Sequence, residues 1–319
     1  MINPFEAFDA LMVLQKEHGN ELSIHDISTM AAEMKEEEEA ELKEMFEEFD
    51  VNQDGKVEIQ ELSDDMSDFA EMMDTDTDGL VSLDEMTSFD VEDALLASEE
   101  EIHERIANLF LEHKATNEIE LKNIAEEKRG RYEEWDADRN GKVSKEEAYE
   151  FMMADNTPIQ FSVSGKTAFM KGVITAALPT KVLQLFFDHP EVDTIEMITV
   201  PGSIDDEANL RAALYVNKMG LTTKLNARSV VASGGTDFFL CGKKRIVEVG
   251  AKLGVHSWGG GAVPAIEVPK DDPVHEKYLD FYKKVGVPIE FYWYTLEAAP
   301  AEEIHMMTPA EMEIYKVRK

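Results

Sequence analysis

The segment NARSVVASGGTDFFLCG, residues 226–242, carries an apolar run that ends at one serine and two glycines before the chain becomes apolar again. The β-branched residues before Ser233 are typical of a buried strand. Ser233 therefore stands where one element ends and the next begins. This position suits a nucleophile, but Ser-Gly-Gly is also common turn chemistry. The partners of Ser233 elsewhere in the chain decide between the two.

The region around this segment alternates between short β-branched runs and amphipathic helical patterns. FMKGVIT (169–175) precedes TKVLQLFFDHP (180–190), and TIEMITV (194–200) precedes DEANLRAALYVNKMG (206–220). Such alternation predicts βαβ units around a largely parallel sheet. In sheets of this kind, functional sites form at the carboxyl ends of the strands.

Two more strand ends carry residues with catalytic chemistry. MITVPGS (197–203) ends in a Pro-Gly-Ser turn, and GAKLGVHSWGG (250–260) reaches His256 before two glycines. A serine and a histidine on separate strand ends, with glycine N–H groups in the turns, supply what acyl transfer needs. We therefore predict Ser233 as the nucleophile and His256 as the general base and acid. The N–H groups expected to hold the developing oxyanion are those of Gly202 and Gly234.

These motifs give residues 165–319 a resemblance to the Clp-protease/crotonase superfamily, above all to its small periplasmic-type serine-protease-like branch. Ser233 of VASGGT matches the family nucleophile, and His256 of LGVHSW matches the family base. The closing stretch APAEEIHMMTPAEMEIYKV is similar to the terminal pattern of the family. The resemblance implies that Glu303 is the acidic member of a triad and orients the histidine, with Glu302 one residue away.

The chain departs from the family pattern at two points. The oxyanion turn of the family carries Pro-Gly-Gly, whereas residues 201–203 read Pro-Gly-Ser. The acidic residue is glutamate where the Clp subunit has aspartate, a change that still allows a carboxylate to orient an imidazole. The first departure favours an alternative in which the fold has lost its chemistry.

Two further features near Ser233 are expected to be structural. The aromatic segment FYWYTL (291–296) predicts a helix packed on the sheet rather than a substrate-binding surface. The single cysteine, Cys241, excludes an internal disulfide and is expected to be a small buried apolar residue.

Three stretches of 12 residues in the first half share one pattern: DVNQDGKVEIQE (50–61), DTDTDGLVSLDE (74–85) and DADRNGKVSKEE (136–147). They resemble EF-hand loops position by position, with oxygen ligands at alternating positions, glycine at the sixth and glutamate at the last. A terminal glutamate supplies two oxygens and favours calcium over magnesium, so we predict three Ca²⁺ sites. The expected ligands are Asp50, Asn52, Asp54, Lys56 (carbonyl), Glu58 and Glu61; Asp74, Asp76, Asp78, Leu80 (carbonyl), Ser82 and Glu85; and Asp136, Asp138, Asn140, Lys142 (carbonyl), Ser144 and Glu147.

The spacing of the loops predicts how they pair. The loops that start at 50 and 74 are separated by a short segment, which we expect to be one shared helix that keeps them from pairing with each other. Segments 15–26 and 112–123 look like EF-hands that have lost their ligands, although ordinary helix–turn–helix is the alternative. We expect these two segments to pair with the loops at 50 and 74. The loop at 136 would then stay single, as in the penta-EF-hand arrangement.

Charge divides the chain into two parts. Residues 1–155 hold 13 Lys and Arg against 47 Asp and Glu, a formal charge of −34, whereas residues 156–319 hold 18 against 20, a charge of −2. The change predicts a domain boundary between 155 and 156. The acidic half would repel nucleic acid and anionic lipid, which leaves cations, basic peptides or no partner at all.

No targeting signal is recognisable in the sequence. The N-terminus lacks the basic region of a signal peptide, and no apolar stretch reaches the length of a membrane span. A soluble, cytoplasmic protein is therefore expected, with an organellar location still open.

Together these features predict a multidomain protein with an all-α EF-hand domain at 1–155 and a Clp/crotonase-like α/β domain at 156–319. We expect a calcium-regulated serine hydrolase that acts on a peptide or protein substrate, in which calcium changes helix angles and exposes or withdraws apolar surface. Analogy with relatives of the second half predicts a homo-oligomer. Two alternatives stay open: a non-catalytic, calcium-dependent scaffold with a degenerate hydrolase fold, and a crotonase-type acyl-thioester enzyme that does not use a serine nucleophile.

Overall fold

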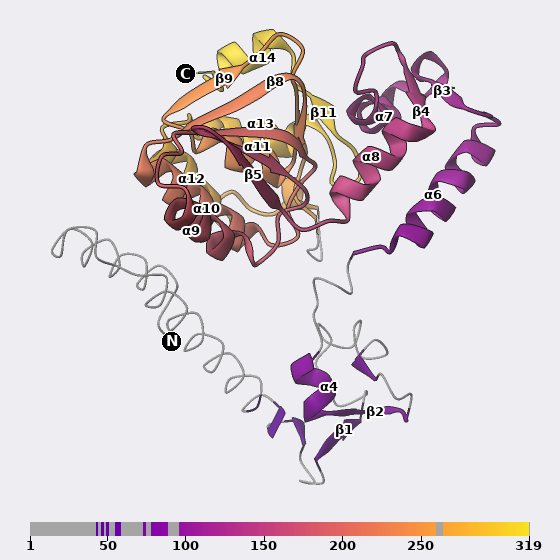
Figure 1. Ribbon diagram of the computed structural model, residues 1–319, viewed down its shortest axis with the longest axis vertical. Helices are drawn as coiled ribbons and strands as arrows, with labels where there is room; N and C mark the ends of the chain where they lie inside the picture. Colours follow the sequence, from indigo (N-terminus) through magenta and orange to yellow (C-terminus); the bar gives the residue numbers. More distant parts are fainter. Residues whose placement is uncertain are drawn as a thin grey trace, which may run out of the picture. The chain divides into compact units, whose positions relative to one another are not determined.

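The computed structural model describes residues 43, 46–47, 49–50, 55–58, 73–74, 78–88, 96–259 and 264–318 (Figure 1). Residue contacts divide the chain into two compact units, Met1–Leu95 and Leu96–Lys319. The domain boundary predicted from the change in charge lies between residues 155 and 156. The contacts group residues 96–155 with the α/β half of the chain. The predicted EF-hand segment at 15–26 lies outside the described residues. Of the helices that the structure describes, none combines the length and apolarity needed to cross a lipid bilayer.

In the first unit, two of the predicted EF-hand loops meet through a short antiparallel pair of strands. β1 (Lys56–Glu58) lies beside β2 (Leu80–Ser82), with Val57 opposite Val81. The prediction that these two loops do not pair with each other is therefore wrong. Residues 62–72, which make up nearly all of the predicted shared helix, lie outside the described residues. The helix α4 (Leu83–Ser88) follows, and the buried core of the pair consists of Phe46, Val57, Met73, Val81 and Met86.

The second unit contains another short antiparallel pair of strands, between segment 112–123 and the predicted loop 136–147. β3 (Glu118–Glu120) runs antiparallel to β4 (Lys142–Ser144), with Ile119 opposite Val143. The ligand-poor segment 112–123 thus pairs with the loop at 136, which the spacing predicts to be single, and not with the loop at 74. That prediction is wrong because the connection breaks into short turns that send the chain back. The elements around the strands are α6 (Glu99–Glu112), the 3₁₀ turns η2 (Leu121–Asn123) and η3 (Glu126–Lys128), α7 (Arg129–Trp135) and α8 (Lys145–Asp155).

A seven-stranded mixed sheet forms the centre of the second unit, which confirms the α/β class predicted for this part of the chain (Figure 1). The strand order is β11-β10-β8-β7-β6-β5, and β9 pairs with β8. The pairs among β6, β7, β8, β9 and β10 are parallel, whereas the edge strands β5 and β11 run antiparallel to their neighbours. The strands are β5 (Gln160–Ser164), β6 (Thr167–Lys171), β7 (Thr194–Val200), β8 (Thr222–Ala232), β9 (Lys244–Val247), β10 (Lys252–Val255) and β11 (His305–Met306).

Helices cover the sheet, and α10 is central among them, in contact with α9, α11 and α12. Cys241 at the end of α11 is fully buried, as its sequence context predicts, and burial raises the pKa of its thiol. The helices are α9 (Leu178–Asp188), α10 (Asp206–Met219), α11 (Gly234–Leu240), α12 (Glu276–Val285), α13 (Glu290–Ala298) and α14 (Pro309–Ile314), with 3₁₀ turns η4 (Ala265–Glu267) and η5 (Pro273–His275).

The long strand β8 pairs with two strands that come later in the sequence, and its register with them brings distant residues together. Its first residues pair with β9, and its last residues pair in parallel with β10, so that Gly254 lies beside Ala232. Parallel strands in this register end at the same edge of the sheet. The residues that follow each strand, Ser233 and His256, therefore emerge next to each other.

Candidate active site and calcium loops

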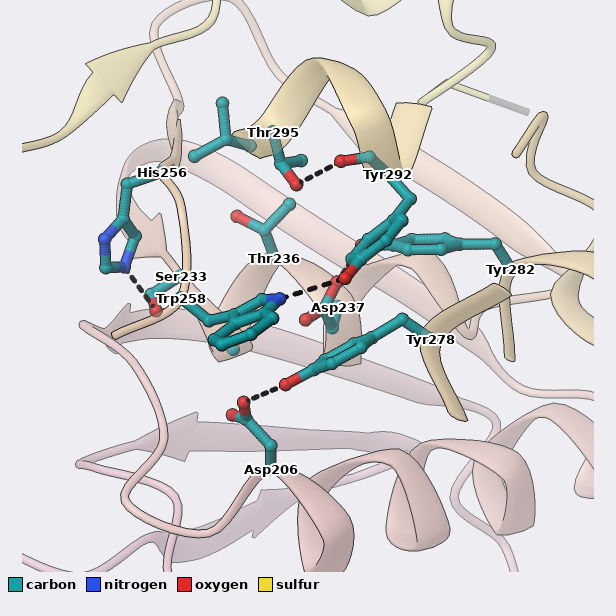
Figure 2. Close-up of a pocket in the computed structure, with 12 residues that line it drawn as sticks. Asp206, Ser233, Thr236, Asp237, His256, Trp258, Tyr278, Tyr282, Tyr292 and Thr295 are labelled. Atoms are coloured by element: carbon teal, nitrogen blue, oxygen red, sulfur yellow. Dashed lines mark hydrogen bonds between the residues drawn. The ribbon is translucent and has the colours of Figure 1, made fainter. Parts of the chain in front are cut away.

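Ser233 and His256 are in direct contact at the carboxyl ends of β8 and β10. The Oγ of Ser233 lies 2.7 Å from Nε2 of His256, a hydrogen-bond distance (Figure 2). The apolar residues Val230, Val231 and Ala232 are buried in the sheet, which fixes the strand that delivers the serine. The structure thus brings together the two residues that the sequence pairs as nucleophile and base.

The backbone of Ser233 adopts a conformation that is unusual for a residue with a side chain. Its φ is 53° and its ψ is −131°, where steric strain is expected outside glycine. Hydrogen bonds hold this sharp turn: Ser233 N–H donates to the Gly254 carbonyl at 3.2 Å, and Thr236 N–H donates to the Ser233 carbonyl at 2.8 Å. A strained turn between a strand and a helix exposes a serine hydroxyl, as in the nucleophile elbows of hydrolases.

The tautomer of His256 follows from its second hydrogen bond. Nδ1 lies 2.9 Å from the carbonyl oxygen of Ala301, which can only accept, so we assign the ring hydrogen to Nδ1. Nε2 then carries the lone pair and accepts from the Ser233 hydroxyl. Burial is the main effect that lowers the pKa of His256 below its usual value, and this favours the neutral ring. The imidazole is therefore in the form that a general base requires.

The carboxylate of Glu303 is not the partner of His256 Nδ1, in contrast to the triad that the resemblance implies. The cause is the path of the main chain: Ser257 N–H donates to the Ala299 carbonyl at 2.9 Å, so the backbone itself runs alongside the histidine. One oxygen of Glu303, Oε2, is buried without a hydrogen-bond partner among the described residues. The Glu302 carbonyl instead accepts from Arg131 Nε at 2.8 Å.

The two glycines predicted to hold an oxyanion lie on either side of the serine. A Cβ added to Gly202 would stand 3.3 Å from Ser233 Cβ, so this turn packs directly on the nucleophile. A Cβ added to Gly234 would lie 2.0 Å from Ser203 Oγ, so glycine leaves the room that Ser203 occupies. The departure to Pro-Gly-Ser is thus accommodated, and Ser203 Oγ donates to the Asp206 carboxylate. The N–H of Gly234 is the first of α11 and has no acceptor within the helix.

A pocket of ≈ 420 Å³, counted to its open mouth, lies beside the Ser–His pair (Figure 2). Sequence reasoning missed most of its lining. The aromatic segment 291–296 lies within α13, so it is helical as predicted, and Tyr292 within it also lines the pocket. No local motif marks the other residues, because they come from four separate segments. They include Asp206, Asp237, Trp258, Tyr278 and Tyr282.

The loop 136–147 has the donor set of a hard cation site. One oxygen each from Asp136, Asp138 and Glu147 lies within 4.8 Å of the others. Asp136 is 4% exposed and accepts from the N–H of Gly141 at 3.1 Å, which shapes the loop around its first ligand. Carboxylate oxygens gathered in this way fit Ca²⁺. Among the residues that the structure describes, this is the group of three or more such ligands close enough to share a metal ion.

Parts of the other two loops are also described. Asp50 accepts from Gly55 N–H at 2.9 Å, and Asp74 accepts from Gly79 N–H at 2.8 Å, as Asp136 does from the equivalent glycine. The glycine φ angles are 83° and 85°, in the left-handed region that the sharp turn requires. Of the predicted ligands, Asn52, Asp54, Glu61 and Asp76 lie outside the described residues.

Comparison with known proteins gives one family match. Residues 41–69 match the family model of the EF hand domain, which includes the first predicted loop and implies calcium binding there. No curated protein matches the chain.

Several solved structures share part of the backbone arrangement. Two are variants of the 1510-N membrane-bound stomatin-specific protease. The first is 13% identical with a TM-score of 0.35 and covers 48% of this chain and 75% of that chain. The second, in complex with a substrate peptide, is 13% identical with a TM-score of 0.32 and covers 46% and 71%. An enoyl-CoA hydratase from Polaromonas sp. JS666 is 10% identical with a TM-score of 0.34 and covers 51% and 69%.

Proposed function

We propose that the second unit is a serine hydrolase that cleaves peptide bonds and that calcium at the loop 136–147 regulates it. The observation that carries the proposal is the 2.7 Å contact between Ser233 Oγ and a His256 ring whose tautomer is fixed for proton abstraction. A nucleophile in contact with a base that is itself oriented by a third group is the arrangement that covalent acyl transfer requires.

In the proposed reaction, Ser233 Oγ forms a bond to the substrate carbonyl carbon while His256 Nε2 takes the hydroxyl proton. The carbonyl π electrons move to the oxygen, which becomes an oxyanion. When this intermediate collapses, the bond to the leaving amine breaks and Nε2 gives its proton to the amine nitrogen. Water then attacks the acylated serine in the same way, and the acid leaves as the proton returns to Oγ.

The N–H groups of Gly202 and Gly234 are proposed to donate to the oxyanion. Both residues border Ser233, and the Gly234 N–H is the first of a helix, where amide hydrogens are not used by the helix itself. Donors of this kind contribute about 3–4 kcal/mol to transition-state stabilisation in other hydrolases. The Ala301 carbonyl orients the histidine but adds no full negative charge, so we expect a slower enzyme than one with a buried carboxylate.

The entry helix of the calcium loop packs against the segment that orients His256. A Cβ on Gly130 in α7 would lie 1.7 Å from the Ile304 carbonyl oxygen, so the helix and this segment touch through their main chains. Arg131, the next residue of α7, donates to the Glu302 carbonyl. The Ala301 carbonyl that holds His256 Nδ1 is one residue away. A shift of α7 is therefore passed to the catalytic histidine through adjacent peptide groups.

The loop and the helix before it also contact two strands of the sheet, β8 and β10. Lys252, the first residue of β10, donates to the carbonyls of Glu133 and Asp136, and Arg139 donates to the Ala227 carbonyl at 2.6 Å. When bound, calcium would neutralise the repulsion among the loop carboxylates and hold them together. Because His256 directly follows β10, one strand connects the proposed calcium site with the proposed active site. This is the basis for regulation by calcium.

We further propose that all three predicted loops bind calcium. The support is their shared ligand pattern and the same carboxylate-to-glycine hydrogen bond at Asp50, Asp74 and Asp136. Three divalent ions would offset part of the excess of acidic residues in the first half. A peptide or protein remains the expected substrate or partner, and the homo-oligomer and the cytoplasmic location stay predictions.

Labelling with a fluorophosphonate probe tests the hydrolase directly. We expect the full chain to be labelled in the presence of calcium and to be labelled more slowly in the presence of a chelator. The Ser233→Ala variant should not be labelled in either condition. Labelling that persists in Ser233→Ala would place the nucleophile elsewhere. No labelling in either condition would favour the calcium-dependent scaffold, which the missing carboxylate at His256 also favours. Turnover of an acyl thioester that survives Ser233→Ala would indicate the crotonase-type alternative.

A further inference from the structure

The pocket beside Ser233 contains two carboxylates without a cationic partner. Asp206 lies at the start of α10 and Asp237 lies in α11, and both line the pocket next to the serine. Among the ion pairs of the described residues, none includes either carboxylate. Two negative groups that face one cavity leave a charge that a ligand can complement.

The hydrogen bonds to these carboxylates come from neutral hydroxyls. Tyr278 donates to Asp206 at 2.5 Å, and Tyr282 donates to Asp237. Burial raises the pKa of Asp237 to about 7, the charge of Asp206 adds to this effect, and the Tyr282 hydrogen bond opposes it. A raised pKa of this origin indicates a carboxylate that lacks a counter-ion. The described hydrogen bonds of Asp237 use one of its two oxygens.

Aromatic rings form another part of the wall. Tyr278 and Tyr292 are stacked with ring centroids 5.2 Å apart, and the Trp258 indole N–H donates to the Tyr292 hydroxyl at 2.9 Å (Figure 2). These contacts hold the rings in place beside the two carboxylates. Ring faces attract cations, and combining them with carboxylates is a common way to recognise an ammonium or guanidinium group.

We propose that this pocket binds the cationic side chain of a lysine or arginine residue in the substrate, beside the bond that Ser233 attacks. The proposal rests on the hydrolase function proposed above and adds its substrate class. An anionic side chain would be repelled by Asp206 and Asp237, and a purely aliphatic one would leave their charge uncompensated. A metal ion is not the expected occupant, because the described ligands that gather for a metal lie in the loop 136–147.

Esters of lysine and of norleucine, which has the same chain without the ammonium group, test the proposal. We measure kcat/KM of the full chain in calcium for the N-acetyl thiobenzyl esters of both. The expected ratio of lysine to norleucine is at least about tenfold, the effect of one charged hydrogen bond. A ratio of one or below would overturn the proposal.

The variant Asp237→Asn keeps an acceptor for Tyr282 and removes only the charge. We expect it to lower the lysine-to-norleucine ratio at least about fivefold. Glu207→Gln is the matched control, since Glu207 follows Asp206 on α10 with 64% of its side chain exposed, and its ratio should equal that of the wild type. An Asp237→Asn ratio equal to that of wild type would contradict the proposal, and circular dichroism of both variants checks their folding.

A binding measurement separates failure of this proposal from failure of the hydrolase. Calorimetric titration of Ser233→Ala with n-butylammonium chloride should show saturable binding that n-butanol lacks and that Asp237→Asn removes. Binding without hydrolysis of any ester would keep the cation pocket and reject the hydrolase. Hydrolysis without binding, or equal binding of the alcohol, would reject the cation pocket alone.

Discussion

Ser233 Oγ and His256 Nε2 lie 2.7 Å apart because β8 and β10 are parallel neighbours that end in register. Ser233 and His256 are far apart in the chain. Because Gly254 pairs with Ala232, Ser233 follows this pair by one residue and His256 follows it by two. The contact depends on two sheet positions and on the Ala301 carbonyl, which fixes the ring. Each of these features gives a measurable consequence.

The lowered pKa of His256 predicts how activity changes with pH. Neutral imidazole is the active form, and burial lowers the pKa, so the base stays available below the usual histidine range. We expect kcat/KM for the uncharged ester p-nitrophenyl acetate to rise with pH through a midpoint below about 6.5 and then to level off. A midpoint clearly above that value would show that the histidine is not the base or is not buried as described.

The strained backbone of Ser233 predicts an unusual order of stability among its variants. Ser233→Gly and Ser233→Ala both remove the hydroxyl, but glycine adopts a φ of 53° without steric cost. We expect Ser233→Gly to be more stable than Ser233→Ala by about 1 kcal/mol in urea denaturation. Equal stability, or greater stability of the alanine variant, would mean that the turn is not strained in solution.

The contact between α7 and the segment after Ala301 predicts a destabilising Gly130→Ala substitution. Alanine in a helix normally stabilises it by up to about 1 kcal/mol relative to glycine. Here the new Cβ would stand 1.7 Å from the Ile304 carbonyl oxygen, so the helix must move. We expect a loss of about 1–3 kcal/mol in the free energy of unfolding, with slower fluorophosphonate labelling. Lys128→Ala, at an exposed position just before the helix, serves as the control and should show neither effect.

The proposed coupling to calcium predicts the effect of one loop ligand. Glu147→Gln removes a carboxylate of the group in the loop 136–147, whereas the exposed neighbour Glu146 does not belong to that group. We expect the calcium dependence of fluorophosphonate labelling to shift to at least about tenfold higher free calcium in Glu147→Gln and to stay unchanged in Glu146→Gln. The same calcium dependence in both variants would separate this loop from the active site.

The parts of the structure that depend on neighbouring residues could be predicted from the sequence. The strand–serine–helix segment at 226–242, the alternation of strands and helices, and the three loops of 12 residues are patterns of neighbouring residues, so they could be predicted from order alone. The pairing of the loops could not. It depends on whether the chain between two loops runs straight or turns back, and the turns at 121–128 carry no strong signal in the sequence.

By itself, the sequence predicted EF-hand loops before an α/β unit and a serine and a histidine at the ends of neighbouring strands. Only the tertiary structure decided that a main-chain carbonyl, rather than Glu303, holds the histidine, and that Asp206 and Asp237 line one pocket with the serine. The physical reason is that these contacts join segments from separate parts of the chain. Their geometry is set by strand register and by backbone paths, which side-chain patterns in one segment do not encode.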